Sequence, residues 1–136
     1  MKGPFAGGCL CGRVRYRSEG AARFGILCFC RDCQRASGGG HVPIIGIDKS
    51  GFRVEGGPAR YVLTGGSGHM TGRNFCPDCG SLLYGTPTVA PDLITLYVGS
   101  LDDPSVFRPT DSVHTRHRNA WDTAGAGLPD HDGARG

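Results

Sequence analysis

The sequence predicts an all-β fold in one small, loop-rich domain that depends on bound metal. Gly and Pro are frequent, with 24 and 9 of 136 residues, and they separate short apolar segments without any amphipathic stretch of ten residues. Only 38% of the residues are hydrophobic, so an apolar core alone would give a marginal fold. Seven cysteines fall in three tight groups, and metal binding there can supply folding free energy directly.

The predicted strands are short and rich in β-branched and aromatic residues. Val14 and Tyr16 alternate with arginines, which predicts a half-buried strand within residues 10–17. The clearest strand covers residues 93–98 (LITLYV). Turn signals at 56–57 (GG), 65–68 (GGSG) and 102–104 (DDP) separate the segments. The other expected strands cover residues 24–27, 42–47, 52–55, 61–64, 74–75 and 81–84, and residues 32–36 are expected to form one helical turn.

One domain over residues 1–124 is predicted, followed by a flexible tail over 125–136 that consists mostly of Gly, Asp and Ala. No apolar run approaches the roughly 18 residues of a membrane span, so we expect no membrane association. Seven cysteines cannot all pair in disulfides, which favours a reduced, cytoplasmic protein. The formal charge of +3 falls to about zero once seven thiolates bind two Zn²⁺, so we do not expect nucleic acid as a partner.

Two cysteine pairs, Cys9 with Cys11 and Cys76 with Cys79, predict a closed structural metal site, here called the quartet. The string CPDCG resembles a zinc knuckle, whose glycine permits the tight turn that aims backbone N–H groups at the sulfurs. Four thiolate ligands are typical of structural zinc. An iron–sulfur cluster is an alternative on ligand type alone, and Cys9 and Cys11 are alternatively small buried hydrophobic residues.

The remaining cysteines, Cys28, Cys30 and Cys33, form a Cys-x-Cys-x-x-Cys group, here called the triplet. Three protein ligands are typical of a catalytic zinc that keeps one position open for water or substrate. In the alternative interpretation the triplet is a second structural site, completed by His41, His69, His114 or Asp32, or it is a thiol cluster without metal.

These groups and the residues around them resemble the glutathione-dependent formaldehyde-activating enzyme family, which also contains centromere protein V. The resemblance runs from GGCLCGRVRY through CFCRDCQRASGGG, FCPDCGSLLY and VGSLDDP to HRNAWDTAGAGLP, about 120 residues. It implies the β-tent fold of that family, two antiparallel sheets leaning together with zinc-binding knuckles. It also implies a structural zinc on the quartet and a catalytic zinc on the triplet.

The function that the resemblance implies is that of a carbon–sulfur lyase acting on adducts of an aldehyde, such as formaldehyde, with glutathione or a related thiol. Phe29 stands between the first two triplet cysteines, where family members often have histidine. Since that histidine is not one of the three sulfur ligands, the metal site is expected to persist with altered surroundings. The alternative function is a non-catalytic zinc module that binds protein or nucleic acid.

A thiol with two carboxylates requires cationic contacts near the triplet. Arg31 and Arg35 flank it and are the candidate carboxylate ligands. His41 follows the SGGG loop and is the candidate proton donor or acceptor. An exposed edge strand could support a homodimer.

Other charged and aromatic side chains are given structural roles. His114 and His117 are expected on one helix face or in a strand and its turn, and Trp121 is expected to pack over a sheet. The arginines expected to be surface charges on strands are Arg13, Arg15, Arg17 and Arg73.

Overall fold

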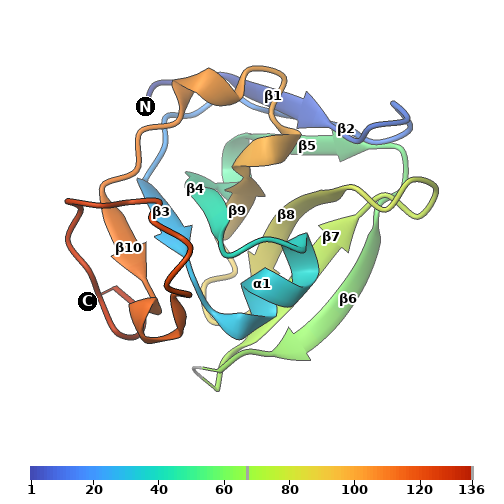
Figure 1. Cartoon of the computed structure of the whole chain (residues 1–136). Helices are drawn as coiled ribbons and strands as arrows, with labels where there is room; N and C mark the ends of the chain where they lie inside the picture. Colours follow the sequence, from blue (N-terminus) through green and yellow to red (C-terminus); the bar gives the residue numbers. More distant parts are fainter. Residues whose placement is uncertain (67, 136) are drawn as a thin grey trace.

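The protein consists of two β-sheets, seen in a computed structural model that describes residues 1–66 and 68–135 (Figure 1). The smaller sheet has the order β1-β2-β5 and the larger one the order β10-β3-β4-β9-β8-β7-β6. The strands are β1 (Phe5–Gly8), β2 (Arg15–Ser18), β3 (Phe24–Cys28), β4 (Val42–Asp48), β5 (Phe52–Glu55), β6 (Ala59–Thr64), β7 (Met70–Phe75), β8 (Leu82–Pro87), β9 (Leu93–Tyr97) and β10 (Asp111–Val113). The all-β prediction is confirmed.

Within the described residues the helical structure is limited to α1 (Arg31–Ser37) and four short 3₁₀ turns. The turns are η1 (Lys49–Gly51), η2 (Val98–Ser100), η3 (Pro104–Val106) and η4 (Thr115–His117). In Figure 1, α1 lies between the β3–β4 side and the β6–β7 side of the larger sheet. No helix in this part of the chain has the length and apolar character needed to cross a membrane.

Two strands were not expected from the sequence, and one of them changes the sheet type. β1 (FAGG) and β10 (DSV) lack the apolar alternation that marks a half-buried strand. β10 pairs in parallel with β3, so the larger sheet is mixed rather than wholly antiparallel. Three residues suffice here because β10 adds to an edge that β3 already provides, and its Ser112 and Val113 are buried.

The larger sheet is buried on both faces at β4 and β9. Ile45 and Ile47 point into the main core between the two sheets, whereas Val42 and Ile44 belong to a second cluster on the opposite face. This two-sided burial explains why β4 reads as a nearly continuous apolar run. The main core includes the quartet residues Cys9 and Cys76, and the second cluster includes the triplet residues Cys28 and Cys33. The fold thus places the two cysteine groups on opposite faces of one sheet.

The segment after residue 124, expected to be a flexible tail, lies along β10 in the structure. Ser112 forms an isolated parallel bridge with Asp130. The amide of Ser112 donates to the carbonyl of Pro129, and the amide of His131 donates back to the carbonyl of Ser112, each at 2.9 Å. These backbone bonds pair residues 129–131 with β10, and the flexibility of the tail stays a prediction. Gly136, the last residue of that tail, lies outside the described residues.

Candidate functional site

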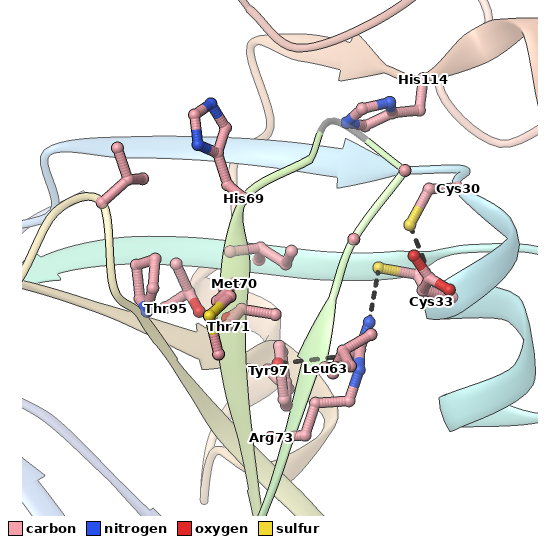
Figure 2. Close-up of a pocket in the computed structure, with 16 residues that line it drawn as sticks. Cys30, Cys33, Leu63, His69, Met70, Thr71, Arg73, Thr95, Tyr97 and His114 are labelled. Carbon is pink, nitrogen blue, oxygen red and sulfur yellow. Dashed lines mark hydrogen bonds between the residues drawn. The ribbon is translucent and has the colours of Figure 1, made fainter.

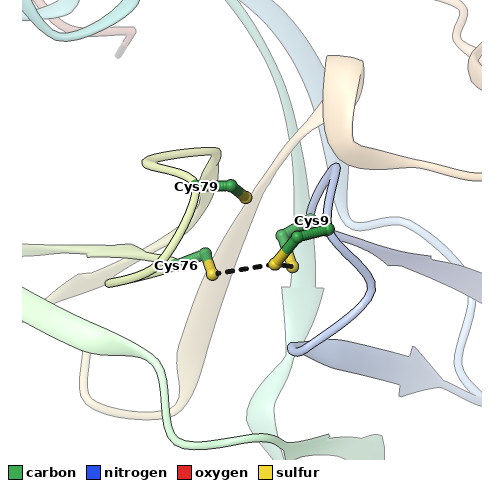
Figure 3. A group of neighbouring side chains, drawn as sticks. Cys9, Cys76 and Cys79 are labelled. Carbon is green, nitrogen blue, oxygen red and sulfur yellow. Dashed lines mark hydrogen bonds between the residues drawn. The ribbon is translucent and has the colours of Figure 1, made fainter.

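The quartet forms where two turns meet at the edge of the main core. The sulfur atoms of Cys9, Cys11, Cys76 and Cys79 lie within 4.8 Å of one another. Figure 3 shows Cys76 and Cys79 on one turn, facing Cys9 on the other. The Sγ of Cys11 lies 3.6 Å from that of Cys9 and 3.7 Å from that of Cys76. The structure therefore brings together all four predicted ligands.

The backbone of both turns is shaped to present sulfur atoms. Gly12 and Gly80 have φ of 84° and 76°, a left-handed conformation that glycine adopts without a steric cost. The amide of Val14 donates to Cys9 Sγ at 3.2 Å. An ion pair of 2.9 Å between Arg13 and Asp78 joins the two turns across the site. These contacts hold the four sulfurs in place from two segments that are distant in sequence.

The quartet fits zinc by the chemistry and spacing of its donors. A Zn–S bond of about 2.3 Å implies sulfur–sulfur distances of about 3.8 Å in a regular tetrahedron. The distances of 3.6 and 3.7 Å within the quartet match this value, and all seven cysteines are free of disulfides. Four sulfur donors leave no position for substrate, which is typical of a structural site.

The triplet lies where β3 ends and α1 begins. Cys28 is the last residue of β3, and Cys30 is the N-cap of α1. The Sγ of Cys30 accepts a hydrogen bond from the amide N–H of Cys33 at 3.2 Å. The three sulfurs lie within 4.8 Å of one another. Within the described residues, no histidine nitrogen or carboxylate oxygen joins this group at that spacing. The three-thiol donor set therefore fits an ion with one open position.

The three thiols of the triplet differ in acidity without metal. Hydrogen bonds from Cys28 and Cys33 lower the pKa of Cys30 to about 2, and the same interaction with Cys30 raises the pKa of Cys28. Cys30 is thus the thiol that ionises first, because its neighbours donate to its thiolate. Cys30 is also the least buried of the three.

A pocket of about 250 Å³ opens beside the triplet, and Cys30 and Cys33 form part of its wall (Figure 2). Arg73 on β7 lines this pocket, although its residue is only 9% exposed. Its guanidinium donates to Cys33 Sγ at 3.6 Å and to Tyr97 Oη at 3.4 Å. No carboxylate lies within ion-pair distance of Arg73 in residues 1–66 and 68–135. A buried cation of this kind can meet negative charge on a bound molecule.

The charge states at this end of the pocket follow from burial. Burial alone lowers the pKa of Arg73, but the neighbouring Tyr97 and Cys33 outweigh it and raise the net pKa, so the guanidinium stays charged. Burial raises the pKa of Tyr97 to about 12, so its phenol stays protonated at neutral pH. Arg73 was expected to be a surface charge. That prediction was wrong because three successive residues of β7, Gly72, Arg73 and Asn74, are buried or enclosed between β6 and β8.

A second cavity, here called the cationic cavity, has a volume of about 340 Å³ and adjoins the first. Two arginines, Arg31 and Arg116, and one acidic residue, Asp32, line it. Arg31, Arg116 and His117 border it, together with Cys30 and His114, which also border the first pocket. Of the two arginines singled out in the sequence, the structure brings Arg31 to the triplet. Arg35 lies on the exposed side of α1 and lines none of the five cavities described in this part of the chain.

The third sequence candidate, His41, lies behind the triplet loop rather than in the pocket. Its Nδ1 lies 2.7 Å from Asp122 Oδ2, and its ring stacks on Phe29 with centroids 5.0 Å apart. Phe29 is fully buried, and the guanidinium of Arg118 covers its ring at 4.4 Å. Phe29 thus points away from the open side of the triplet and supports the loop from behind.

Residues 114–119 complete the site. Gln34 on α1 is buried and donates to the carbonyls of Phe29 and His117 at 2.8 and 3.0 Å, which ties the triplet loop to this segment. His114 has a left-handed backbone (φ 52°) that is uncommon for a residue with a side chain, and it lines both cavities. Trp121 was expected to pack over a sheet, but it is 71% exposed.

The fold and the site define a small two-sheet β protein with two cysteine clusters that could hold metal ions. A model of the family described as glutathione-dependent formaldehyde-activating enzyme (GFA) matches residues 4–117. The chain therefore belongs to the glutathione-dependent formaldehyde-activating enzyme family.

Other comparisons concern the fold. A crystal structure of a Rhodobacter sphaeroides protein matches with a TM-score of 0.58 and 18% sequence identity, over 93% of this chain and 98% of that chain. At this identity the likeness shows a shared fold alone. No curated protein matches the chain in sequence.

Proposed function

We propose that the protein is a zinc-dependent carbon–sulfur lyase that acts on adducts of an aldehyde with glutathione or a related thiol. In the forward direction the sulfur of the thiol adds to the aldehyde carbon. One C–S bond forms, the C=O bond becomes a C–O bond, and the thiol proton ends on the oxygen. The reverse direction breaks the C–S bond and returns thiol and aldehyde. Membership of the family supports this chemistry.

The observation that carries the proposal is the difference between the two cysteine groups. The triplet has three sulfurs and its residues line three cavities, whereas the quartet has four sulfurs and lines none of the cavities described in residues 1–66 and 68–135. A binding module would have four protein ligands at both metals. The quartet thus suits a structural zinc and the triplet a catalytic one.

Cys28, Cys30 and Cys33 would hold the catalytic ion, which would supply stabilisation of negative charge on the substrate sulfur. Arg73 is placed to donate to the aldehyde oxygen as charge develops on it, because its guanidinium lines the pocket beside Cys33. The neutral phenol of Tyr97 lies next to this guanidinium and keeps it oriented. Holding thiol and aldehyde in adjoining cavities supplies proximity, which also accelerates a reaction that proceeds without an enzyme.

The cationic cavity would bind the carboxylates of the thiol. Arg31 and Arg116 are both exposed and border it, so each can offer a forked contact to a carboxylate. The Nη1 of Arg31 donates to Gln34 Oε1, which fixes the side chain along α1 at the border of this cavity. Arg35 on the same helix provides a matched comparison, because it lies outside the cavity.

The function is tested by the rate at which the zinc-loaded protein forms and splits S-hydroxymethylglutathione, followed by NMR exchange between free and adduct signals. The proposal predicts acceleration over the spontaneous reaction, and its loss in Cys30→Ser with the fold retained. Arg31→Ala should weaken glutathione binding about tenfold, a loss of about 1.4 kcal/mol, while Arg35→Ala should leave it unchanged. Exchange no faster than in buffer, in the presence of two bound zinc ions, would refute the proposed function.

The setting that we propose is a reducing compartment such as the cytoplasm, because seven free cysteines bind metal only as thiolates. The homodimer stays a prediction. The edge strand β6, with Tyr61 and Val62 exposed, is the segment where pairing between two copies is expected.

A further inference from the structure

The pocket beside the triplet has an apolar wall that formaldehyde does not require. The side chains of this wall, which we call the apolar chamber, are Ile44, Leu63, Met70, Pro87, Val89 and Tyr97. They come from β4, β6, β7, β9 and the end of β8 with the turn after it, so the wall is a product of the fold. We propose that the chamber receives an apolar carbon substituent of the aldehyde, a chain or ring of about four to six carbons. This inference rests on the proposed function and specifies its substrate class.

The chamber begins at the place where the new C–S bond would form. Cys30 and Cys33 belong to the same pocket as the apolar residues. Figure 2 shows Met70 and Thr95 across the pocket from Cys30 and Cys33, with Arg73 and Tyr97 below them. An aldehyde carbon held near the triplet, with its oxygen toward Arg73, therefore directs its substituent along β7 and β9 toward Met70.

The size of the pocket agrees with such a substituent. An apolar cavity of about 150 Å³ accepts benzene, and a water molecule occupies about 30 Å³ in the liquid. Formaldehyde has two heavy atoms and is close to water in size. The pocket of about 250 Å³ is far larger than formaldehyde needs, and it accommodates a six-carbon group together with the carbonyl.

The exposed apolar side chains of the chamber also favour binding of an apolar ligand. Met70 is 49% exposed and Val89 is 63% exposed, and both line this pocket. Single exposed apolar side chains are ordinary, but here two converge on one cavity that also contains Leu63 and Ile44. A substituent in the chamber would remove their apolar surface from water, which favours binding.

The thiol itself is a poor occupant of this wall. Glutathione is polar and carries two carboxylates, and the cationic cavity with Arg31 and Arg116 offers them partners. The two cavities share Cys30, Asp32, His114 and the glycines at 65 and 66, so one adduct can span both. Its polar half then lies with the arginines and its apolar half in the chamber.

Unreactive thioethers test the inference by binding alone. Calorimetric titration of the zinc-loaded protein with S-methyl-, S-propyl-, S-butyl- and S-hexylglutathione measures the effect of chain length. Full burial of a methylene contributes up to about fourfold in affinity, so about two- to fourfold per carbon is expected, and roughly 30-fold or more from methyl to hexyl. Leu63→Trp should fill the chamber and abolish this gain, while affinity for S-methylglutathione stays within about twofold.

Val62→Trp is the matched control, because neighbouring strand residues point to opposite faces and Val62 does not line the pocket. Val89→Asp, at an exposed position, gives a second variant with little risk to folding and should also reduce the gain in affinity with chain length.

Binding of glutathione without any chain-length effect would overturn the inference and leave the proposed function standing. A chain-length effect that Leu63→Trp and Val89→Asp leave intact would place the alkyl group elsewhere and overturn it too. A Leu63→Trp protein that binds S-methylglutathione much more weakly would show that glutathione itself occupies the chamber, which also contradicts the inference. Absence of all glutathione binding would refute both proposals.

Discussion

Replacing Arg73 with methionine separates the catalytic role proposed for this residue from a structural one. Methionine retains most of the apolar stem but removes the guanidinium. The two hydrogen bonds lost, of 3.6 Å to Cys33 Sγ and 3.4 Å to Tyr97 Oη, are long. Their net contribution to folding therefore lies at the low end of the usual range, about 0.5–1 kcal/mol. A domain of 136 residues should then lose no more than about 3–5 °C in melting temperature.

The expected effect on the reaction is much larger. A donor that meets charge developing on an oxygen contributes about 100- to 1000-fold in rate. Arg73→Met should therefore lower kcat/KM by at least about 100-fold, with most of the loss in kcat. Arg73→Lys keeps the charge without the planar fork, so its kcat/KM should lie between those of the parent protein and Arg73→Met.

The assay combines NMR exchange kinetics of the glutathione adduct with zinc content and thermal unfolding of the same preparation. A kcat/KM within threefold of the parent protein at unchanged zinc content would refute the catalytic role of Arg73. Loss of one zinc together with activity would instead show that Arg73 acts through Cys33, as a positioning residue for the metal site.

Three further results are expected. Cys76→Ser should abolish cooperative thermal unfolding, because Cys76 is fully buried in the main core and is a proposed ligand of the structural zinc. Cys30→Ser should instead melt cooperatively with one zinc per chain. Circular dichroism and metal analysis distinguish the two, and a stable Cys76→Ser protein would contradict the structural assignment of the quartet. Phe29→Ala should cost about 3–5 kcal/mol in unfolding free energy, measured by urea denaturation, because the side chain is fully buried between His41 and Arg118; a loss below 1 kcal/mol would show that Phe29 does not support the loop. Burial opposes ionisation of Asp122, but the hydrogen bonds from His41 and the Ala124 amide outweigh it and lower the pKa of Asp122. The pair of His41 and Asp122 should therefore stabilise the fold fully at pH values above the unfolded-state pKa of about 3.9. That contribution should be lost as the pH falls below this value. A carboxyl-carbon NMR titration should give a midpoint for Asp122 below about 3.9, and a higher midpoint would contradict the pairing.

The sequence predicted the parts of this protein that local patterns encode. The cysteine spacings located both cysteine clusters that could hold a metal ion. Apolar runs located the central strands, because β4 and β9 bury side chains on both faces. The glycine of CPDCG indicated a tight turn, and Gly80 has the expected positive φ.

Features that depend on contacts between distant segments could not be read in this way. The inward direction of Arg73 is set by the registers of β6, β7 and β8, and only its place on the strand that leads to Cys76 gave a signal. Arg116 reaches the cationic cavity because β10 joins the edge of β3, and the three residues of β10 (DSV) are too short a segment to predict that pairing. The apolar chamber likewise draws single residues from several strands, so no segment of the sequence contains its pattern.

The central claim is that the triplet is an open site and the quartet a closed one. An absorption titration of the cobalt-substituted protein with glutathione tests it most directly, through the intensity of thiolate-to-cobalt charge transfer. The account predicts two cobalt ions per chain and an intensity that rises from that of seven thiolates toward that of eight as glutathione is added, with no such rise in Cys30→Ser. An unchanged spectrum at saturating glutathione would mean that the triplet is filled or rejects the thiol, and it would contradict the account.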